Sequence, residues 1–410
     1  MSIVAARRKF VAVVVVLLGL GALSAASVAP AVGAVRRAPT GGAFYLPPQP
    51  LAKAKPGTII RSTPIKDAPT GSRAWKILYH SRAVDGTDIA VSGVIVAPTT
   101  RAPRGGRVVV TWGHGAAGLG DQCAPSKQRD VVSSASFALN PAGFVSVIPL
   151  LRTFLDAGYV VAATDYEGLG TPGLHPFLVG ESEGRSVLDA ARAARGVKAA
   201  AATNKVLVFG HSQGGHAALF AGELAASYAP DLRVLGVAPE APVAPDMEQN
   251  FRVLGSVSAA NGLVVTLVDA FHAAYAQFDP AALLTPDAVA QASLVNQKCG
   301  LPEPFSSSPD LVLAHNPLEI PAVATILHTN SAGNRRSGAP LLVVQGSADD
   351  GAPQFLTDAF VAKACAAGDT VDYRVYAGAT HLGVVPTAAD DVVAWFADRV
   401  AGAPATSTCN

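Results

Sequence analysis

The sequence predicts an α/β protein with a mostly parallel central sheet and helices on both faces. Short β-branched runs alternate with helical segments over residues 71–242, and the alternation resumes over residues 338–410. This alternation is typical of parallel sheets covered by helices. Between residues 243 and 337 it fails, since that stretch has helical segments, several prolines and no convincing strand. We predict a helical cap inserted over the carboxyl edge of the sheet, where open α/β sheets bind ligands.

The N-terminus has the layout of a secretory signal peptide, predicted for residues 1–34. Arg7, Arg8 and Lys9 precede an apolar stretch at 11–23, and small residues ending in Val32-Gly33-Ala34 follow. The alternative is an uncleaved membrane anchor. The expected location is therefore outside the cell or in the cell envelope. Residues 35–70, rich in Pro, Gly and Thr, are predicted as an extended arm or a partly disordered segment.

The core elements follow in order along the chain. "AWKILYHSRAVDGTDIAVSGVIVAP" predicts two strands joined at Asp85-Gly86, and "IPLLRTFLDAG" predicts a helix that ends at Gly158. Strands are predicted in "RVVVTWGHG", "YVVAATDYEGLG", "KVLVFG" and "RVLGVAPEAP", and helices in "EGRSVLDAARAARGV" and "GGHAALFAGELAASYA". After the cap come the strands "APLLVVQG" and "VDYRVY", with the helices "PQFLTDAFVAKACAAG" and "AADDVVAWFADRVAG".

Charge and cysteine content exclude several classes of partner. The net charge is +1 and no basic block is present, which argues against nucleic acid as a partner. The four cysteines, Cys123, Cys299, Cys365 and Cys409, form no CxxC pair, so no metal site is predicted. An even number in an exported chain predicts two disulfides, and three pairings remain open.

One short motif carries the chemistry. Gly210-His211-Ser212-Gln213-Gly214 fits G-x-S-x-G between a predicted strand and an Ala-rich helix. Such a turn holds the serine Oγ clear of the sheet and points backbone amides at a developing oxyanion. The alternative is an ordinary glycine-rich turn. We predict Ser212 as a nucleophile, with the Gln213 amide as the first oxyanion donor.

A serine nucleophile needs a base and an orienting acid, in the chain order Ser, acid, His. His381 follows a late strand and precedes the last helix, so we predict it as the base. His216, one helical turn past Ser212, is expected to be a packing residue. The acid should follow "APLLVVQG", which leaves Asp349 and Asp350, and we favour Asp349.

Other polar residues near the strand ends receive supporting roles. The second oxyanion donor is expected at Gly115-Ala116, after "RVVVTWGHG", and His114 is expected to be structural. Asp165 and Tyr166 are predicted as part of a substrate-pocket wall. The acidic cluster that begins the next helix is predicted to be solvated; it comprises Glu181, Glu183 and Asp189.

The chain resembles the secretory lipase family, the group similar to fungal lipase A. The resemblance rests on "TWGHGAAGLGDQCAPS", "ATDYEGLG", "GHSQGGHAALFAGELA" and "QGSADDGAP…THLGVV", in that order. It implies an α/β-hydrolase fold, a triad at Ser212, Asp349 and His381, and no cofactor. It also implies the disulfides Cys123–Cys299 and Cys365–Cys409. In this chain Gly351 and Ala352 replace the bulky residues usual before the proline of the acid turn.

The resemblance implies hydrolysis of triacylglycerols or simpler esters by a secreted enzyme, and a monomer is favoured. The cap segment "LGSVSAANGLVVTLVDAFHAAYAQF" has more apolar residues than one buried helix face requires. Val264, Leu267 and Phe271 are predicted to line an acyl pocket, and the surplus could also contact a lipid surface transiently. The alternative is that they only pack together. Rival functions are a peptidase or thioesterase of the same fold, and an inactive binding protein.

Overall fold

The computed structural model of the chain describes residues 41–133, 137–141, 143–254, 261–292, 295–300 and 312–409. The predicted signal peptide at residues 1–34 lies outside these ranges. Within them, no helix has both the length and the apolar character needed to cross a bilayer.

Nine strands form one sheet in the order β1-β2-β3-β5-β4-β6-β7-β8-β9. The pairs from β1 to β5 along this order are antiparallel, and all pairs from β5 to β9 are parallel. The strands are β1 (Ile59–Ile65), β2 (Ser72–Arg82), β3 (Asp88–Pro98), β4 (Arg107–Gly113), β5 (Val160–Thr164), β6 (Ala202–His211), β7 (Arg233–Glu240), β8 (Leu341–Gly346) and β9 (Val371–Tyr376).

The antiparallel edge contains the predicted hairpin and one strand that was not predicted. β2 and β3 pair along their whole length, and Gly86 occupies the turn with a φ of 87°. Strand β1 lies within the segment predicted as an extended arm and adds to the open edge of β2. Pro64 and the alternating burial of its later residues are typical of an edge strand. The segment is extended as a strand because it pairs with β2.

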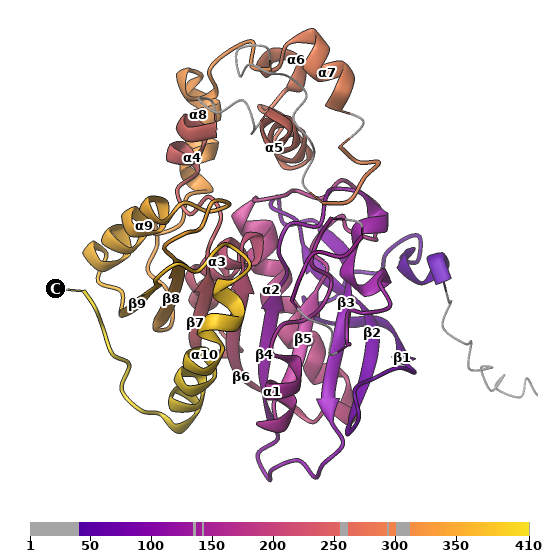
Figure 1. Ribbon diagram of the computed structural model, residues 1–410. Coiled ribbons are helices and arrows are strands. Elements are labelled where there is room, and N and C mark those ends of the chain that lie inside the picture. The colour runs from indigo at the N-terminus through magenta and orange to yellow at the C-terminus, as the bar shows by residue number, and fades with distance from the viewer. Residues whose placement is uncertain are drawn as a thin grey trace, which may run out of the picture. The chain divides into compact units, whose positions relative to one another are not determined.

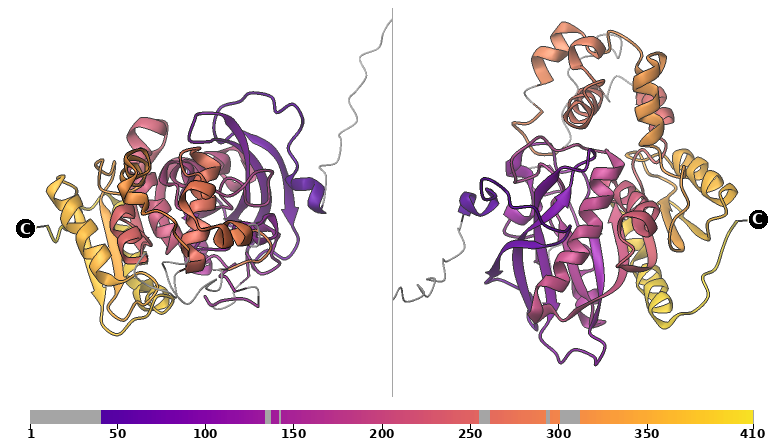
Figure 2. Two further views of the ribbon diagram at one scale, coloured as in Figure 1. Left: turned by 90° about the horizontal axis from the view of Figure 1, so that it is seen from above. Right: turned by 180° about the vertical axis from the view of Figure 1, so that it is seen from behind.

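Helices cover both faces of the sheet (Figures 1 and 2). They are α1 (Leu151–Asp156), α2 (Gly180–Gly196), α3 (Gln213–Tyr228), α9 (Gln354–Ala366) and α10 (Val384–Ala401). One buried cluster packs α2, α3 and α9 against one face, and a second packs α1 and α10 against the other. Helix α1 stops where predicted, because Gly158 takes a φ of 83° after its last turn.

The cap lies between β7 and β8 in sequence, and Figure 1 shows it beyond the carboxyl ends of the strands. Its helices are α4 (Met247–Leu254), α5 (Asn261–Ala274), α6 (Pro280–Leu283), α7 (Pro286–Ala292) and α8 (Pro321–Thr329). Its two ends meet at the core, since the Ala332 N–H donates to the Pro245 carbonyl over 2.8 Å.

The cap has its own apolar core, to which Val264, Leu267 and Phe271 belong. Leu267 and Phe271 are fully buried, and the Phe271 ring lies 4.8 Å from that of Phe278 between centroids. The three side chains therefore pack against one another and their neighbours within the cap.

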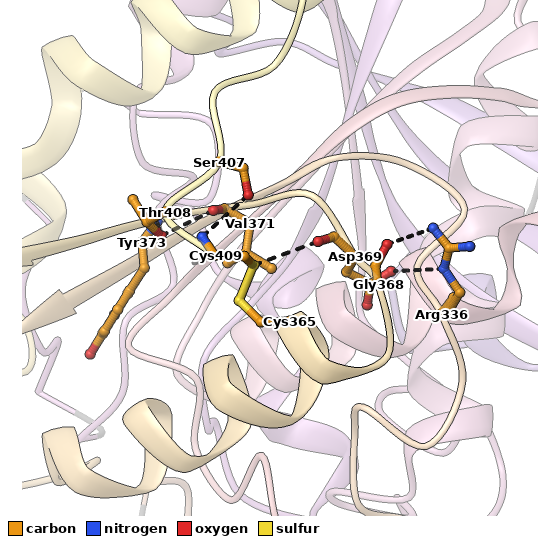
Figure 3. The surroundings of a disulfide bond; sticks show 9 residues. All are labelled: Arg336, Cys365, Gly368, Asp369, Val371, Tyr373, Ser407, Thr408 and Cys409. Atoms are coloured by element: carbon orange, nitrogen blue, oxygen red, sulfur yellow. Dashed lines mark hydrogen bonds and ion pairs between the residues drawn. A yellow bond between two sulfur atoms is a disulfide. The ribbon is translucent and has the colours of Figure 1, made fainter.

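The two disulfides pair as the family resemblance implies. Cys123–Cys299 ties the segment after β4 to the cap. Figure 3 shows Cys409 joined to Cys365 of α9, with Thr408 beside Val371. The Thr408 N–H donates to the Val371 carbonyl over 2.7 Å, so the C-terminal segment runs along the edge strand β9. Each closed loop contributes about 2–4 kcal/mol by restricting the unfolded chain.

A buried glutamate joins α3 to the segment that returns from the cap. Glu223 accepts a hydrogen bond from the Gly333 N–H over 2.6 Å, and Arg335 Nε lies 3.7 Å from its other oxygen. Burial raises the pKa of Glu223 to about 7, although these two partners oppose the shift. Because the folded pKa lies above the unfolded value, its stabilising effect is complete below about pH 4.5 and is lost as pH rises through 7.

We therefore expect Glu223→Gln to be more stable than the wild type at pH 8, by about 2 kcal/mol, and close to it at pH 5. The amide keeps an acceptor for Gly333 and carries no charge at either pH. Urea unfolding at both pH values measures the difference. A gain of equal size at pH 5 and pH 8 would contradict the assignment, because a packing effect does not depend on pH.

Candidate active site

Ser212 lies on the sharp turn between β6 and α3, in a backbone conformation that few residues adopt. Its φ is 61° and its ψ is −120°. The Ser212 N–H donates to the Glu240 carbonyl over 3.0 Å, and its own carbonyl accepts from the Val243 and His216 N–H groups over 3.1 Å. The turn therefore holds the serine at the carboxyl end of the sheet, as the motif predicts.

Glycines make this turn possible. A Cβ atom on Gly210 would lie 2.0 Å from the Gly214 carbonyl oxygen, and one on Gly214 would lie 1.9 Å from the Gly113 carbonyl oxygen. Any side chain at either position would force β4, β6 and α3 apart. Glycine at both positions therefore allows the strand and the helix to approach closely.

The structure brings Ser212, His381 and Asp349 into one hydrogen-bonded chain. Ser212 Oγ lies 2.9 Å from His381 Nε2, and His381 Nδ1 lies 2.9 Å and 3.0 Å from the two Asp349 carboxylate oxygens. Since a carboxylate only accepts, Nδ1 carries the proton and Nε2 presents its lone pair to the serine hydroxyl. This is the arrangement in which a histidine can take a proton from a serine.

The turn after β8 holds the acid in place. Asp349 Oδ1 accepts from the Gly351 and Ala352 N–H groups over 2.9 Å and 2.7 Å, and Gln345 Nε2 donates to Oδ2 over 3.1 Å. Asp350 is exposed. The small Gly351 is required, because a Cβ there would lie 2.9 Å from His381 Cγ.

His211, the residue before the serine, supports the His381 loop and was not singled out in the sequence. His211 Nε2 lies 2.7 Å from the His381 carbonyl oxygen, and the two rings lie 4.7 Å apart between centroids. Burial and the neighbouring His381 lower the pKa of His211 to about 3, so its ring is neutral and Nε2–H donates. Its position in the motif was the available signal, but a motif does not show what the side chain contacts.

The predicted oxyanion donors lie beside the serine. Gln213 is the first residue of α3, so its N–H has no partner within the helix. Gly115 follows β4, and a Cβ on it would lie 3.6 Å from Ser212 Cβ. Ala116, next in the chain, packs against the core of the cap. The two backbone segments therefore both lie close to Ser212.

Asp165, Tyr166 and His114 support this loop from beneath. The Tyr166 hydroxyl donates to the His114 carbonyl over 3.0 Å, and His114 Nε2 lies 3.3 Å from the Asp165 carbonyl. The Asp165 carboxylate accepts from the Ser126 N–H over 2.9 Å and from Ser92 Oγ over 2.6 Å. All are buried. Burial lowers the pKa of His114, which fits its predicted structural role.

The prediction of a solvated acidic helix start is wrong for Glu183 and Asp189, which are both 0 % exposed. Asp189 accepts from Ser81 Oγ, the Tyr228 hydroxyl and Arg192 Nη1 over 2.7–2.8 Å. Glu183 accepts from the Leu178 N–H over 2.8 Å and faces α3. The face of α2 that carries both residues packs against the sheet and α3, which sequence spacing alone did not reveal.

Glu240, at the end of β7, is a buried acidic residue whose backbone contacts the serine. Its backbone carbonyl holds the Ser212 N–H, and it pairs with His211 across the sheet. Among the described residues neither carboxyl oxygen has a hydrogen-bond partner, and burial raises the pKa of Glu240 well above its usual value. Within the described part of the chain, no cluster of three or more His, Cys, Asp or Glu could hold a metal ion.

Comparison with known proteins gives relatives over most of the chain. Lipase A of Arthroderma benhamiae is 26% identical over 391 residues, covering 90% of this chain and 81% of the relative. A protein of Mycobacterium tuberculosis named as a probable inactive lipase is also 26% identical, covering 90% and 84%. A secreted triacylglycerol lipase of Malassezia restricta is 31% identical, covering 47% of this chain and 41% of the relative.

Solved structures give the same fold. Candida antarctica lipase A superposes with a TM-score of 0.72 at 19% identity, covering 87% of this chain and 84% of that chain. The cell-wall-degrading esterase LipA of Xanthomonas oryzae gives 0.65 at 19% identity, covering 83% and 97%. The fold is therefore the predicted α/β-hydrolase fold.

The sequence profile of the secretory lipase family matches residues 145–408, which include Ser212, Asp349 and His381. With this match over more than half of its length, the chain belongs to the secretory lipase family.

Proposed function

We propose that the protein is an exported serine hydrolase that cleaves carboxylic esters, triacylglycerols among them, through an acyl-enzyme intermediate. The observation that carries the proposal is the hydrogen-bonded chain from Ser212 through His381 to Asp349. Membership of the secretory lipase family supports the ester as the substrate class.

The steps follow from the geometry. Ser212 Oγ attacks the ester carbonyl while His381 Nε2 takes its proton, and Asp349 stabilises the imidazolium. The amides of Gln213 and of Gly115 or Ala116 hold the oxyanion of the tetrahedral intermediate. Its collapse breaks the ester bond, and His381 gives the proton to the departing alcohol. Water then attacks the acyl-enzyme by the same route and releases the carboxylic acid.

Export and acyl-chain selection are further parts of the proposal. Two disulfides suit an oxidising compartment, and the Malassezia relative is named as a secreted triacylglycerol lipase. The cap lies beyond the carboxyl ends of the parallel strands, where Ser212 also lies, so we assign the acyl chain to the apolar surface of the cap that faces this edge. Because Val264, Leu267 and Phe271 are buried among their neighbours, we place the acyl chain beside this cluster and not within it.

The inactive-protein alternative has one specific observation in its favour, the Mycobacterium tuberculosis relative named as a probable inactive lipase. The hydrogen-bonded contact among Ser212, His381 and Asp349 supports activity here.

A peptidase or thioesterase would use the same acyl-enzyme, so a panel of ester, thioester and amide substrates with one acyl group separates these activities. Ester hydrolysis at the highest kcat/KM is the expected result.

Ser212→Ala is expected to abolish ester hydrolysis, lowering kcat by about 10⁴ to 10⁶ while the fold persists, because it removes the nucleophile. Hydrolysis of a short aryl ester and circular dichroism measure the two effects. Activity above a hundredth of the wild-type value would contradict the assignment of Ser212 as the nucleophile.

Asp349→Asn is expected to lower kcat by about 10⁴, because an amide at this position no longer stabilises the imidazolium. Asp350→Asn is the matched control: it changes the neighbouring carboxylate in the same turn, which is exposed, and should cost less than about threefold. The opposite ranking of the two variants would mean that Asp350 is the acid.

Val264, Leu267 and Phe271, each replaced by a smaller apolar residue, should change the preference among ester chain lengths more than the rate on an acetate ester. Each change alters the wall on which we place the acyl chain. Val392→Ala in α10, which packs on the sheet, removes the same two methyl groups as Val264→Ala, and it should lower stability and leave the preference unaltered. If the cap variants slowed all chain lengths in parallel, the cap would be structural support and not a selector.

A further inference from the structure

A cluster of buried polar side chains lies at the start of α3, and the mechanism above does not use these side chains. This elbow cluster comprises His175, Glu183, Gln213, His216 and Asn330, which come from four separate segments of the chain. Every member is at most 1 % exposed. Burial of so many polar groups is costly unless each is bound, so their contacts define what the cluster does.

Gln213 is the centre of the elbow cluster. Its side-chain Nε2 lies 2.7 Å from Glu183 Oε1 and 2.8 Å from His175 Nε2. The orientation of the amide is unambiguous, because turning it over would place its oxygen against the Glu183 carboxylate. Its own Oε1 has no hydrogen-bond partner among the described residues. The side chain therefore keeps both N–H groups bound and leaves a buried oxygen unpaired.

The two acceptors of Gln213 are themselves held. His175 Nδ1–H donates to the Glu167 carbonyl over 2.8 Å, which leaves Nε2 as an acceptor for the glutamine. Burial lowers the pKa of His175 to about 4, so this neutral form persists at neutral pH. The His175 ring also stacks on Tyr166, with 5.6 Å between centroids and 10° between planes.

Glu183 connects the cluster to its surroundings. Its Oε1 also accepts from the Leu178 N–H, before α2, and its Oε2 lies 3.1 Å from His216 Nδ1 on α3. His216 Nε2 lies 3.3 Å from the Asn330 carbonyl, and Asn330 Oδ1 accepts from the Gly180 N–H over 2.9 Å. One carboxylate thus links α2, the first turn of α3 and the segment returning from the cap.

We propose that Glu183 and His175 are positioning residues that hold Gln213 so that its backbone N–H stays aimed at the oxyanion. The proposal rests on the proposed function, since it assigns a role within the same active site. The backbone donor and the anchored amide belong to one residue, so rotation of that peptide would have to break both side-chain bonds. Oxyanion donors act only when they are aligned in advance, and removing one costs about 10² to 10³ in kcat.

Gln213→Met tests this with the donor itself left in place. Methionine has a similar length and keeps the backbone N–H, but it cannot bind Glu183 or His175. We expect kcat on p-nitrophenyl acetate to fall about 30- to 100-fold, with KM within about threefold, because the interaction is made mainly in the transition state. The inhibition constant of a trifluoromethyl ketone, which forms a tetrahedral oxyanion with a serine, should rise by a similar factor.

Asp189→Asn is the matched control. Asp189 is another fully buried carboxylate of α2 with several hydrogen-bonding partners, and none of these belongs to the elbow cluster. This variant should lower the melting temperature and leave kcat within about twofold.

Glu183→Gln is the conservative variant within the elbow cluster. It should lose less than about fivefold in kcat, because its amide oxygen still accepts from the Leu178 N–H and the Gln213 amide. His216 can shift its proton to Nε2 and donate to the Asn330 carbonyl.

The outcomes separate this inference from the proposed function. A wild-type protein without esterase activity overturns both. An active wild type whose Gln213→Met variant keeps kcat within threefold, or loses kcat without weakening the ketone, overturns the inference alone. Where Gln213→Met does not fold, His175→Phe decides, because it keeps a ring against Tyr166 and removes the acceptor for Gln213. A fall in kcat with a matching rise in the inhibition constant of the ketone supports the positioning role, and both values within threefold of the wild type overturn it.

Discussion

The strained turn at Ser212 is the constraint on which the rest of the site depends. A residue with positive φ and a side chain costs about 1–3 kcal/mol and persists only where its surroundings enforce it. Here the Glu240 carbonyl holds its N–H, and the N–H groups of Val243 and His216 hold its carbonyl. The contact of Gly214 with Gly113 then fixes how deeply α3 sits against β4. The nucleophile, the start of α3 and the exit to the cap are therefore set together.

The sheet and the Ser212, His381 and Asp349 arrangement could be predicted from sequence because each rests on local pattern. Alternating β-branched and helical runs identify parallel strands, and the order of those strands places residues after β6, β8 and β9 at one edge. Strand β1 was not predicted, because its residues are extended both in a surface arm and in a strand. Only its pairing with β2 distinguishes the two. The disulfide pairing came from resemblance, since three pairings fit the cysteines equally.

The burial of Glu183 and Asp189 could not be predicted for a different reason. Carboxylates in the first turns of a helix usually face water, where the helix dipole favours them. Glu183 in the first turn of α2 and Asp189 in its middle instead face α3 and the sheet. Partners from distant segments satisfy them: Gln213 and His216 for Glu183, Ser81 and Tyr228 for Asp189. Such partners are separated by tens of residues in sequence, so no window of residues reveals them.

The junction of the cap with the core has a consequence for how proteins of this architecture diversify. The insertion leaves after Pro245 and returns at Ala332. The Ala332 N–H donates to the Pro245 carbonyl and the Met247 N–H donates to Ser331 Oγ, so the two ends lie side by side. A segment whose ends are adjacent can be lengthened, shortened or exchanged without altering the register of the strands on either side. Cys123–Cys299 is the one covalent cross-link between this segment and the rest of the described chain. An exchanged cap that retains a cysteine at position 299 would still form the disulfide with Cys123. Chimaeras of related chains therefore provide a direct route to new ligand preferences on an unchanged α/β core.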